Sequence, residues 1–469
     1  MSTPTVSVVV PAYGQAEYLG EAIASVLDQT YTNLEVVVVN DASPDATDDV
    51  VRQFTDPRIT YVTHDVNRGL PAARNTGIDA SRGSLLAFLD ADDYFHRDKI
   101  AAHVARLAQF PALGLTYAWR FNLNCGQPTI RDLWQPPGSC TLSDLVLGFP
   151  FAPSDMVIRR EWLVRVGQFD AALTDMSEDL DICCRLALLG CPMAGIPRAL
   201  TYRRYYSGRR LRVRRRHAAA MKVLEAVFAD PRCPPGIRSL RPQARAAHTR
   251  TWALHALVQG DTTIGQDLLR AAVRDDPSVL AGHPSPLVRA MLRVAIADES
   301  QNHDEVLTAI VDQCPAELQS VRRDYDWAVG HGHVLRAVRA ALWERLVETE
   351  QHFARAAALG AEIDPGLLQG VTHDLIGLEQ ERGSAAGSLA LERLERGFES
   401  IGGPWTGRKL RGCFAVNRAF RHHREARPRE VLTHVGQALV YDPRYLANWG
   451  VWSMVVGSLV PVVRRQWSR

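Results

Sequence analysis

The first 115 residues alternate between short apolar runs and helical patterns, and this alternation limits the possible folds more than any other feature of the chain. The apolar runs occupy residues 6–10, 34–40, 58–64 and 84–90. Three of them are apolar at nearly every position, as strands buried on both faces of a parallel sheet are. Helical segments lie between them, and Ser43-Pro44 is the expected start of one. The order predicts an α/β fold with a doubly wound, mostly parallel sheet.

Three of these runs end at short stretches that can contact a ligand: PAY at 11–13, ND at 40–41 and DADD at 90–93. The carboxyl ends of parallel strands meet at one edge of a sheet, where ligands bind, so we expect these residues to lie together. Three carboxylates within four residues repel one another unless a cation, a donor group or water compensates them. They are therefore expected to serve something other than stability, with a plain strand-end turn as the alternative.

The strand patterns stop near residue 216, and helical periodicity rich in alanine and arginine continues to the end. We therefore predict two domains, an α/β domain over 1–216 and an all-α domain over 217–469. Residues 256–277 and 431–443 each end an amphipathic helix in Asp-Pro. They look like tetratricopeptide-type helical hairpins, although their spacing is irregular. Such a domain could bind a protein partner.

Composition limits the other classes of function. The 469 residues carry a formal net charge of +2, which gives no general reason to expect a nucleic-acid partner. The eight cysteines lack paired CxxC spacing and no signal peptide is evident, so we expect reduced thiols in a cytoplasm. No apolar run reaches the ~18 residues of a membrane span. The apolar stretch 449–463 could lie on the inner face of a membrane or pack on its own domain, which allows at most peripheral association.

Four stretches together resemble the family 2 glycosyltransferases: VSVVVPAYGQAEYLGEAIASVLDQTYTNLEVVVVNDASPD, NRGLPAARNTGIDASRG, FLDADD and FDAALTDMSEDLDICCRLALLG. The resemblance covers about residues 5–205, with every motif in order. It implies a GT-A fold and inverting transfer of a sugar from a nucleoside diphosphate donor of the UDP or dTDP type. The implied acceptor is a hydroxyl of a glycan, a lipid-linked molecule or another compound, and the implied cofactor is Mn²⁺ or Mg²⁺.

The resemblance also implies roles for the carboxylates after the fourth strand. Asp92 matches the metal ligand, and Asp90 matches the residue that faces the ribose or a metal-bound water. Asp93 is expected to be solvated or to cap a turn. Many relatives have a histidine for the metal shell where this chain has Tyr205 or Tyr206, and tyrosine binds divalent cations poorly at neutral pH. A site held mainly by Asp92 and the donor phosphates is therefore expected.

Donor contacts are implied for four further residues. Asp41 matches the carboxylate that accepts the ring N–H of a uracil or thymine, and Pro11 and Tyr13 would line the same pocket. The alternative for Asp41 is a cap on the following helix. Arg74 matches a position near the donor, where its guanidinium could bind phosphate or pair with an aspartate of the rim. The arginine-rich run 203–216 could contact the donor diphosphate, attract an anionic acceptor or serve as a linker.

The pair Glu178-Asp179 matches the acceptor side of the family. An inverting displacement needs a base to take the proton of the attacking hydroxyl, and Asp179 resembles that base. Glu178 would orient it or contact the acceptor. The alternative is that both acids only stabilise the N-terminus of a helix.

Two other classes of function are weighed against this one. A nonenzymatic interaction protein could keep a GT-A scaffold and bind partners through its helices, but the set of Asp41, Asp90, Asp92 and Asp179 argues for chemistry. A nucleotidyltransferase would need a glycine-rich phosphate loop after the first strand, and PAYGQAEY has one glycine.

Overall fold

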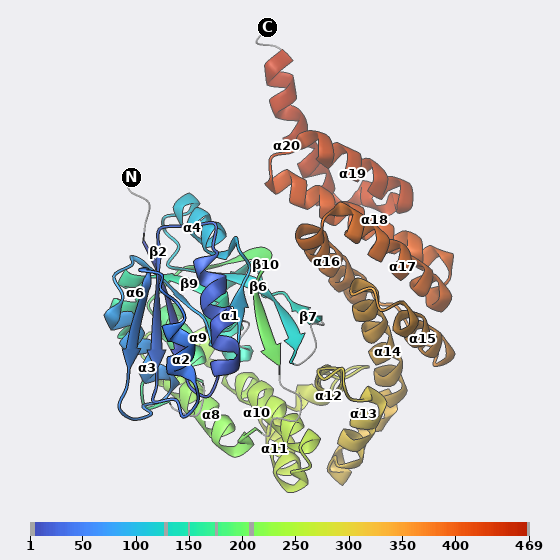
Figure 1. The fold of residues 1–469 in the computed structure, drawn as a ribbon. Coiled ribbons are helices and arrows are strands. Elements are labelled where there is room, and N and C mark those ends of the chain that lie inside the picture. Colours follow the sequence, from blue (N-terminus) through green and yellow to red (C-terminus); the bar gives the residue numbers. More distant parts are fainter. Residues whose placement is uncertain (1–4, 126–129, 149–150, 174–176, 206–210, 467–469) are drawn as a thin grey trace. The chain divides into compact units, whose positions relative to one another are not determined.

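The apolar runs of the N-terminal part form one sheet, which the computed structural model shows with helices on both of its faces (Figure 1). The model describes residues 5–125, 130–148, 151–173, 177–205 and 211–466. In spatial order the main strands are β3 (Ile59–Thr63), β2 (Leu34–Asn40), β1 (Val6–Ala12), β4 (Leu85–Phe88), β9 (Met156–Arg159), β6 (Leu115–Asn124), β10 (Met193–Tyr205) and β5 (Tyr94–Phe95). Two further strands pair at the side, β7 (Ile130–Trp134) with β6 and β8 (Ser139–Cys140) with β10.

The predicted parallel strands are confirmed in the first half of the sheet. Strands β3, β2, β1 and β4 run parallel, and every residue of β1, β2 and β4 is buried, which explains their continuous apolar sequence. The second half is mixed, because β9 lies antiparallel to both β4 and β6 while β10 is parallel to β6. The carboxyl ends of β1, β2 and β4 therefore meet at one edge.

Helices cover both faces of the sheet. One face packs against α1 (Ala16–Leu27), α2 (Thr47–Arg52) and α4 (Lys99–Gln109). The other face packs against α3 (Leu70–Ala80), α5 (Leu142–Leu147), α6 (Arg160–Val166) and α7 (Glu178–Leu188). Neighbouring residues of β1 alternate between these two cores, since Val8 and Val10 join the first and Val9 joins the second. The two cores hold the loops at the strand ends in place.

The prediction that Ser43-Pro44 starts the second helix is wrong. Helix α2 begins three residues later, at Thr47. The acceptor at this end is Asp45, whose Oδ1 accepts hydrogen bonds from the backbone N–H of Thr47 (3.2 Å) and from the Ser43 hydroxyl (2.5 Å). Because Asn40 Oδ1 accepts from the backbone N–H of Ser43 (2.8 Å), residue 43 belongs to the turn after β2 and not to the helix.

After β10 the described residues form only helices, which confirms the predicted all-α region. Its α-helices are α8 (Val213–Ala229), α9 (Pro235–Arg238), α10 (Arg241–Val258), α11 (Thr262–Asp275), α12 (Pro286–Ala295), α13 (His303–Asp312), α14 (Tyr325–Leu342), α15 (Leu346–Ala358), α16 (Pro365–Arg382), α17 (Ser384–Gly402), α18 (Pro404–Arg424), α19 (Pro428–Tyr441) and α20 (Trp449–Gln466). At both Asp-Pro steps a helix ends and a 3₁₀ turn begins, η2 (Pro277–Leu280) and η4 (Pro443–Ala447). Among the helices of the described ranges, none combines the length and hydropathy that crossing a bilayer requires.

The chain forms two compact units, Met1–Arg322 and Arg323–Arg469. Helices α8 and α10 belong to the first unit, because Val223, Leu224, Val227 and Ala244 are buried in the same core as residues of α7. The last described strand ends at Tyr205, before the predicted boundary at 216/217, and as a division of labour between domains this boundary stays a prediction.

This packing predicts where the chain can be shortened. A chain ending after Arg322 should fold and melt cooperatively, since its core is complete. A chain ending at Met221 should lose the cooperative melt, because it exposes the apolar face of α7 that Leu224 and Val227 cover. Thermal melts followed by circular dichroism would check both. A cooperative melt of the 1–221 chain would contradict the assignment of α8 and α10 to this core.

Candidate active site

The structure brings the polar residues after β1, β2 and β4 to one edge of the sheet. The backbone N–H of Asp41 donates to the carbonyl of Ala12 at 3.0 Å, which joins the ends of β1 and β2. Pro11 is buried within β1, whereas the side chain of Tyr13 is 51% exposed at the edge. Asp90 follows β4 by two residues. This edge is the candidate site, and we call it the rim.

Arg74 connects two predicted site residues that lie 88 positions apart in the sequence. It lies on α3, its side chain is 1% exposed, and its Nη2 donates to Asp90 Oδ1 at 2.7 Å while its Nη1 donates to Glu178 Oε1 at 2.5 Å. Burial acts to lower the pKa of Arg74, but the charges of Asp90 and Glu178 raise it above its usual value. Of the two roles left open by the sequence, the structure shows the pairing with a rim aspartate.

Glycine at position 77 sets how closely α3 approaches the sheet. A Cβ built at Gly77 would lie 2.3 Å from Cγ1 of Val9, so only glycine allows this separation. Arg74 lies one turn earlier on the same helix. The close contact of α3 with β1 therefore fixes the position from which the guanidinium reaches Asp90 and Glu178.

Glu178 and Asp179 form the first turn of α7. Asp179 Oδ1 accepts from the backbone N–H of Leu180 (2.8 Å), and Glu178 Oε2 accepts from that of Ser177 (3.1 Å), so both acids also satisfy the helix N-terminus. Burial, and then the charge of Glu178, raises the pKa of Asp179 to about 7. A carboxyl group with such a pKa can accept and release a proton near neutral pH.

Two residues beside the site have an unusual backbone conformation. Ala42, next to Asp41, has a φ of 54°, and Ser177, next to Glu178, has a φ of 111°. Positive φ angles cost non-glycine residues about 1–3 kcal/mol and are concentrated at functional sites. The strain fits a site where the directions of two acidic side chains matter.

The loop after β4 concentrates negative charge beside β10. Asp90 is 28% exposed and Asp92 is half-buried. Asp93 is 1% exposed, so the expectation that it is solvated is wrong: its Oδ1 accepts from the backbone N–H of Arg204 (3.1 Å), because β10 packs over the loop. Burial, followed by the charges of Asp92 and Asp90, raises the pKa of Asp93 well above its usual value. Carboxylate oxygens are the ligands that a hard divalent cation prefers, so Asp92 and Asp90 have the donor chemistry of the predicted metal site, and their role as ligands stays a prediction.

Asp41 is held by the loop that precedes α3. Its Oδ1 accepts from the backbone N–H of Arg68 (2.8 Å) and its Oδ2 from that of Gly69 (2.8 Å), so it does not cap α2. His64 was not predicted, and its Nδ1 lies 2.7 Å from Asp41 Oδ1. Its position directly after β3 was the available signal, since that strand ends at the same rim. The proposed contact of Asp41 with a base stays a prediction.

Arg204 belongs to the arginine-rich run 203–216 and contacts the loop after β4. Its Nη1 donates to the backbone carbonyl of Asp92 (2.7 Å), and its guanidinium also lies over the rings of Tyr18 (4.7 Å) and Tyr94 (5.1 Å) and pairs with Glu21. The start of the arginine-rich run is thus packed beside the loop that follows β4. Tyr206 and residues 207–210 of that run lie outside the described residues.

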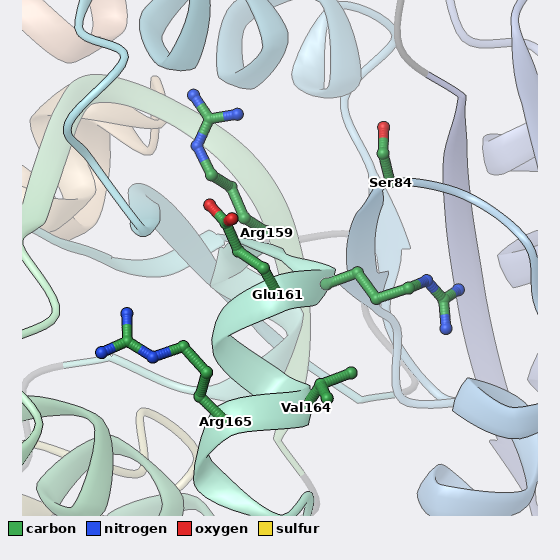
Figure 2. Close-up of a pocket in the computed structure, with 6 residues that line it drawn as sticks. Ser84, Arg159, Glu161, Val164 and Arg165 are labelled. Carbon is green, nitrogen blue, oxygen red and sulfur yellow. The ribbon is translucent and has the colours of Figure 1, made fainter.

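An open surface pocket lies at the opposite edge of the sheet (Figure 2). Ser84, which precedes β4, and Arg159, which ends the antiparallel β9, both contribute to it. Arg159 Nε donates to the carbonyl of Leu113 (2.8 Å) and Arg160 Nε to that of Gly83 (2.6 Å), so these arginines support the backbone. The pocket is not part of the candidate site.

The acidic residues at the ends of the parallel strands are thus joined, through the buried Arg74, to a second acidic pair on α7. Residues 7–163 match the family described as "Glycosyl transferase family 2". This match confirms the predicted resemblance to the family 2 glycosyltransferases for the N-terminal part of the chain. The predicted fold class, a GT-A-type α/β domain followed by an all-α region, is confirmed as well.

The chain is also similar to individual proteins. Glycosyltransferase GlyA of Streptococcus pneumoniae serotype 4 is 38% identical over 109 residues, which cover 23% of this chain and 16% of the relative. The Escherichia coli protein WfgD, named UDP-Glc:alpha-D-GlcNAc-diphosphoundecaprenol beta-1,3-glucosyltransferase, is 36% identical over 102 residues, which cover 22% and 40%. The crystal structure of S. aureus TarS has a TM-score of 0.45 at 16% identity and covers 69% of this chain and 55% of that chain. The chain thus spans less than half the length of these two sequence relatives.

Proposed function

We propose that the protein is an inverting glycosyltransferase that transfers a sugar from a nucleoside diphosphate donor, of the UDP or dTDP type, to a hydroxyl acceptor. The observation that carries the proposal is the bridge made by Arg74. It holds Asp90, from the motif expected on the donor side, and Glu178, from the motif expected on the acceptor side, in one hydrogen-bonded cluster. A transfer reaction needs these two sides adjacent, whereas a scaffold that only binds partners does not.

The residues divide the chemistry as follows. Asp41, Pro11 and Tyr13 bind and orient the nucleoside at the ends of β1 and β2. Asp92 and Asp90 would hold the divalent cation, which would supply positive charge to the leaving diphosphate. Asp179 accepts the proton of the attacking acceptor hydroxyl, and Glu178, fixed by Arg74, orients it.

The acceptor is proposed to be a glycan or a lipid-linked glycan at the cytoplasmic face of a membrane. The support is the name of the Escherichia coli relative, which gives a diphosphoundecaprenol acceptor. The helical region beyond β10 would position the acceptor or recruit a protein partner, since every motif matched to the donor lies before residue 206.

Metal dependence can be tested by calorimetry with UDP and dTDP, using Mn²⁺, Mg²⁺ or chelator. Binding should be at least tenfold tighter with a cation, because the cation links Asp92 to the diphosphate, and Asp92→Ala should abolish this difference. Asp65→Ala serves as the matched control, since Asp65 is an exposed acid just after β3 at the same edge. Equal binding with cation and with chelator in the unmutated protein would contradict the metal role.

A further inference from the structure

Helix α20 has apolar side chains on the side that faces away from its own core. Val451, Met454 and Ser458 are buried, and the first two pack with α18 and α19. Trp449, Trp452 and Val456 are 84%, 39% and 59% exposed. At 100° per residue the two sets are centred roughly 160° apart around the helix axis. An ordinary surface helix carries polar residues on that outer side, but residues 449–463 contain no charged side chain at all.

Neighbouring elements extend this outer stripe. Arg408 and Arg444 lie 5.7 and 5.9 Å from the ring of the exposed Trp405, and Arg408 Nη2 donates to the carbonyl of Val440 (3.2 Å). The carbonyl of Leu446 accepts from Trp452 Nε1 (2.7 Å), which ties η4 to α20. Within the second unit, Figure 1 shows α20 running on past α18 and α19. We define the C-terminal apolar surface by its exposed members, Trp405, Val440, Leu446, Trp449, Trp452 and Val456.

The surface lies in a strongly basic part of the chain. Residues 401–469 contain twelve arginines and lysines against three acids, a formal charge of +9 in a protein whose total is +2. One of the three acids, Asp442, pairs with Arg444 at 2.6 Å, and another, Glu425, lies 3.5 Å from Arg427. Arg464 and Arg465 follow directly after the apolar stretch. Of these basic residues, Arg408 and Arg444 lie beside the exposed Trp405, whereas Arg411 and Arg418 pair with Glu395 and Glu379.

We infer that the C-terminal apolar surface docks on a lipid bilayer that contains anionic lipids. Tryptophan side chains prefer the boundary between lipid tails and headgroups, and arginines beside them are attracted to anionic headgroups. An apolar stripe with basic residues around it is the pattern of a helix that lies in this boundary. A protein partner would not require the excess positive charge. A nucleic acid would not require the exposed apolar side chains of Val440, Leu446 and Val456. The inference goes beyond the proposed transferase activity and does not depend on it.

Vesicle sedimentation with the full-length protein tests the inference. The protein should sediment with vesicles of equimolar phosphatidylcholine and phosphatidylglycerol, and much less with phosphatidylcholine alone. Binding should fall as NaCl rises from about 0.05 to 0.5 M, because salt screens the headgroup charge. The double substitution Trp449→Ser with Val456→Ser should weaken binding to mixed vesicles by about tenfold or more, since it removes the two most exposed apolar groups of α20. Replacing Arg408 and Arg444, the two arginines beside Trp405, by glutamine should reduce only the preference for anionic vesicles.

A matched control comes from α15 in the same unit. Leu346 and Val347 are 49% and 69% exposed but lie between Glu344 and Glu348, so changing both to serine should leave vesicle binding unchanged. Circular dichroism checks that each variant keeps its helices. Equal loss in the α15 and α20 variants, sedimentation without preference for anionic vesicles, or retention of poly-uridylate RNA with none of vesicles would each overturn the inference. Because no sugar transfer is measured, failure here leaves the proposed function untouched.

Discussion

Asp179→Asn should lower the rate of sugar transfer by roughly 10² to 10⁴, about 3 to 5 kcal/mol in the activation barrier, because it removes the proposed proton acceptor and keeps the size of the side chain. Affinity for the donor nucleotide should barely change, since Asp179 is proposed to face the acceptor. Initial rates with donor and acceptor, together with nucleotide calorimetry, measure the two effects separately. Glu178→Gln should lower the rate less and act partly on the acceptor KM.

The pH dependence of the same reaction provides an independent check. The pKa of Asp179 is raised to about 7, so the unmutated enzyme should lose about tenfold in kcat/KM at pH 6 relative to its plateau above pH 8. The Asn variant should lack this step. Near-full activity in Asp179→Asn with loss of activity in Glu178→Gln would mean that Glu178 is the base and Asp179 the orienting residue. Near-full activity in both variants would mean that the two acids only stabilise the N-terminus of α7.

Folding stability distinguishes a damaged site from a damaged fold. A carboxyl group whose pKa is raised from 3.8 to about 7 binds a proton in the folded chain but not in the unfolded chain between these values. Its contribution to the free energy of unfolding is therefore present below pH 4 and is lost as the pH rises through 7. Asp179→Asn should be at least as stable as the unmutated protein at pH 8, and a large drop in Tm there would contradict this account.

Arg74→Met should lower the free energy of unfolding by about 3–5 kcal/mol, because it strands Glu178 beside Asp90 without the positive charge between them. Urea unfolding measures this loss. Transfer activity should fall as well, because Glu178 loses its fixed orientation.

Two controls accompany this change. Arg74→Lys keeps the charge but not the two-pronged guanidinium, so it should recover only part of the stability. Arg82→Met removes an arginine that also pairs with a buried acid, Glu35 at 3.0 Å, but whose own side chain is 80% exposed. Arg82→Met should therefore lower the free energy of unfolding by less than about 1 kcal/mol. Equal losses in the free energy of unfolding for Arg74→Met and Arg82→Met would show that burial of the Arg74 ion pairs adds nothing to their contribution to stability.

The sequence was sufficient for the parts of the fold that depend on local pattern. Strands β1 and β2 consist of buried apolar runs, so both their type and their parallel pairing follow from composition and order. The convergence of Asp41 and Asp90 on one rim follows from the same order. The all-α region follows from its long helical periodicity.

Features that depend on distant parts of the chain could not be predicted. Asp93 reads as an exposed loop residue, yet it is buried because β10, a hundred residues later, packs over it. The two acids that Arg74 pairs with lie on the loop after β4 and on α7. No local sequence pattern shows whether this arginine binds those acids or a phosphate. Ser43 resembles a helix cap in the sequence, but the backbone N–H of Thr47 donates to Asp45 instead.

The place of α8 and α10 in the N-terminal core has a consequence for how the protein is made. When β10 has left the ribosome the sheet has all its strands, but Val223, Leu224, Val227 and Ala244 have still to be translated or released. At about 5–20 residues per second, the roughly 40 residues between Tyr205 and Ala244 take about 2–8 seconds. During this interval the apolar face of α7 is uncovered in the nascent chain. The domain is thus expected to require chaperone protection at this stage of synthesis, and slow codons placed between residues 206 and 244 should increase aggregation.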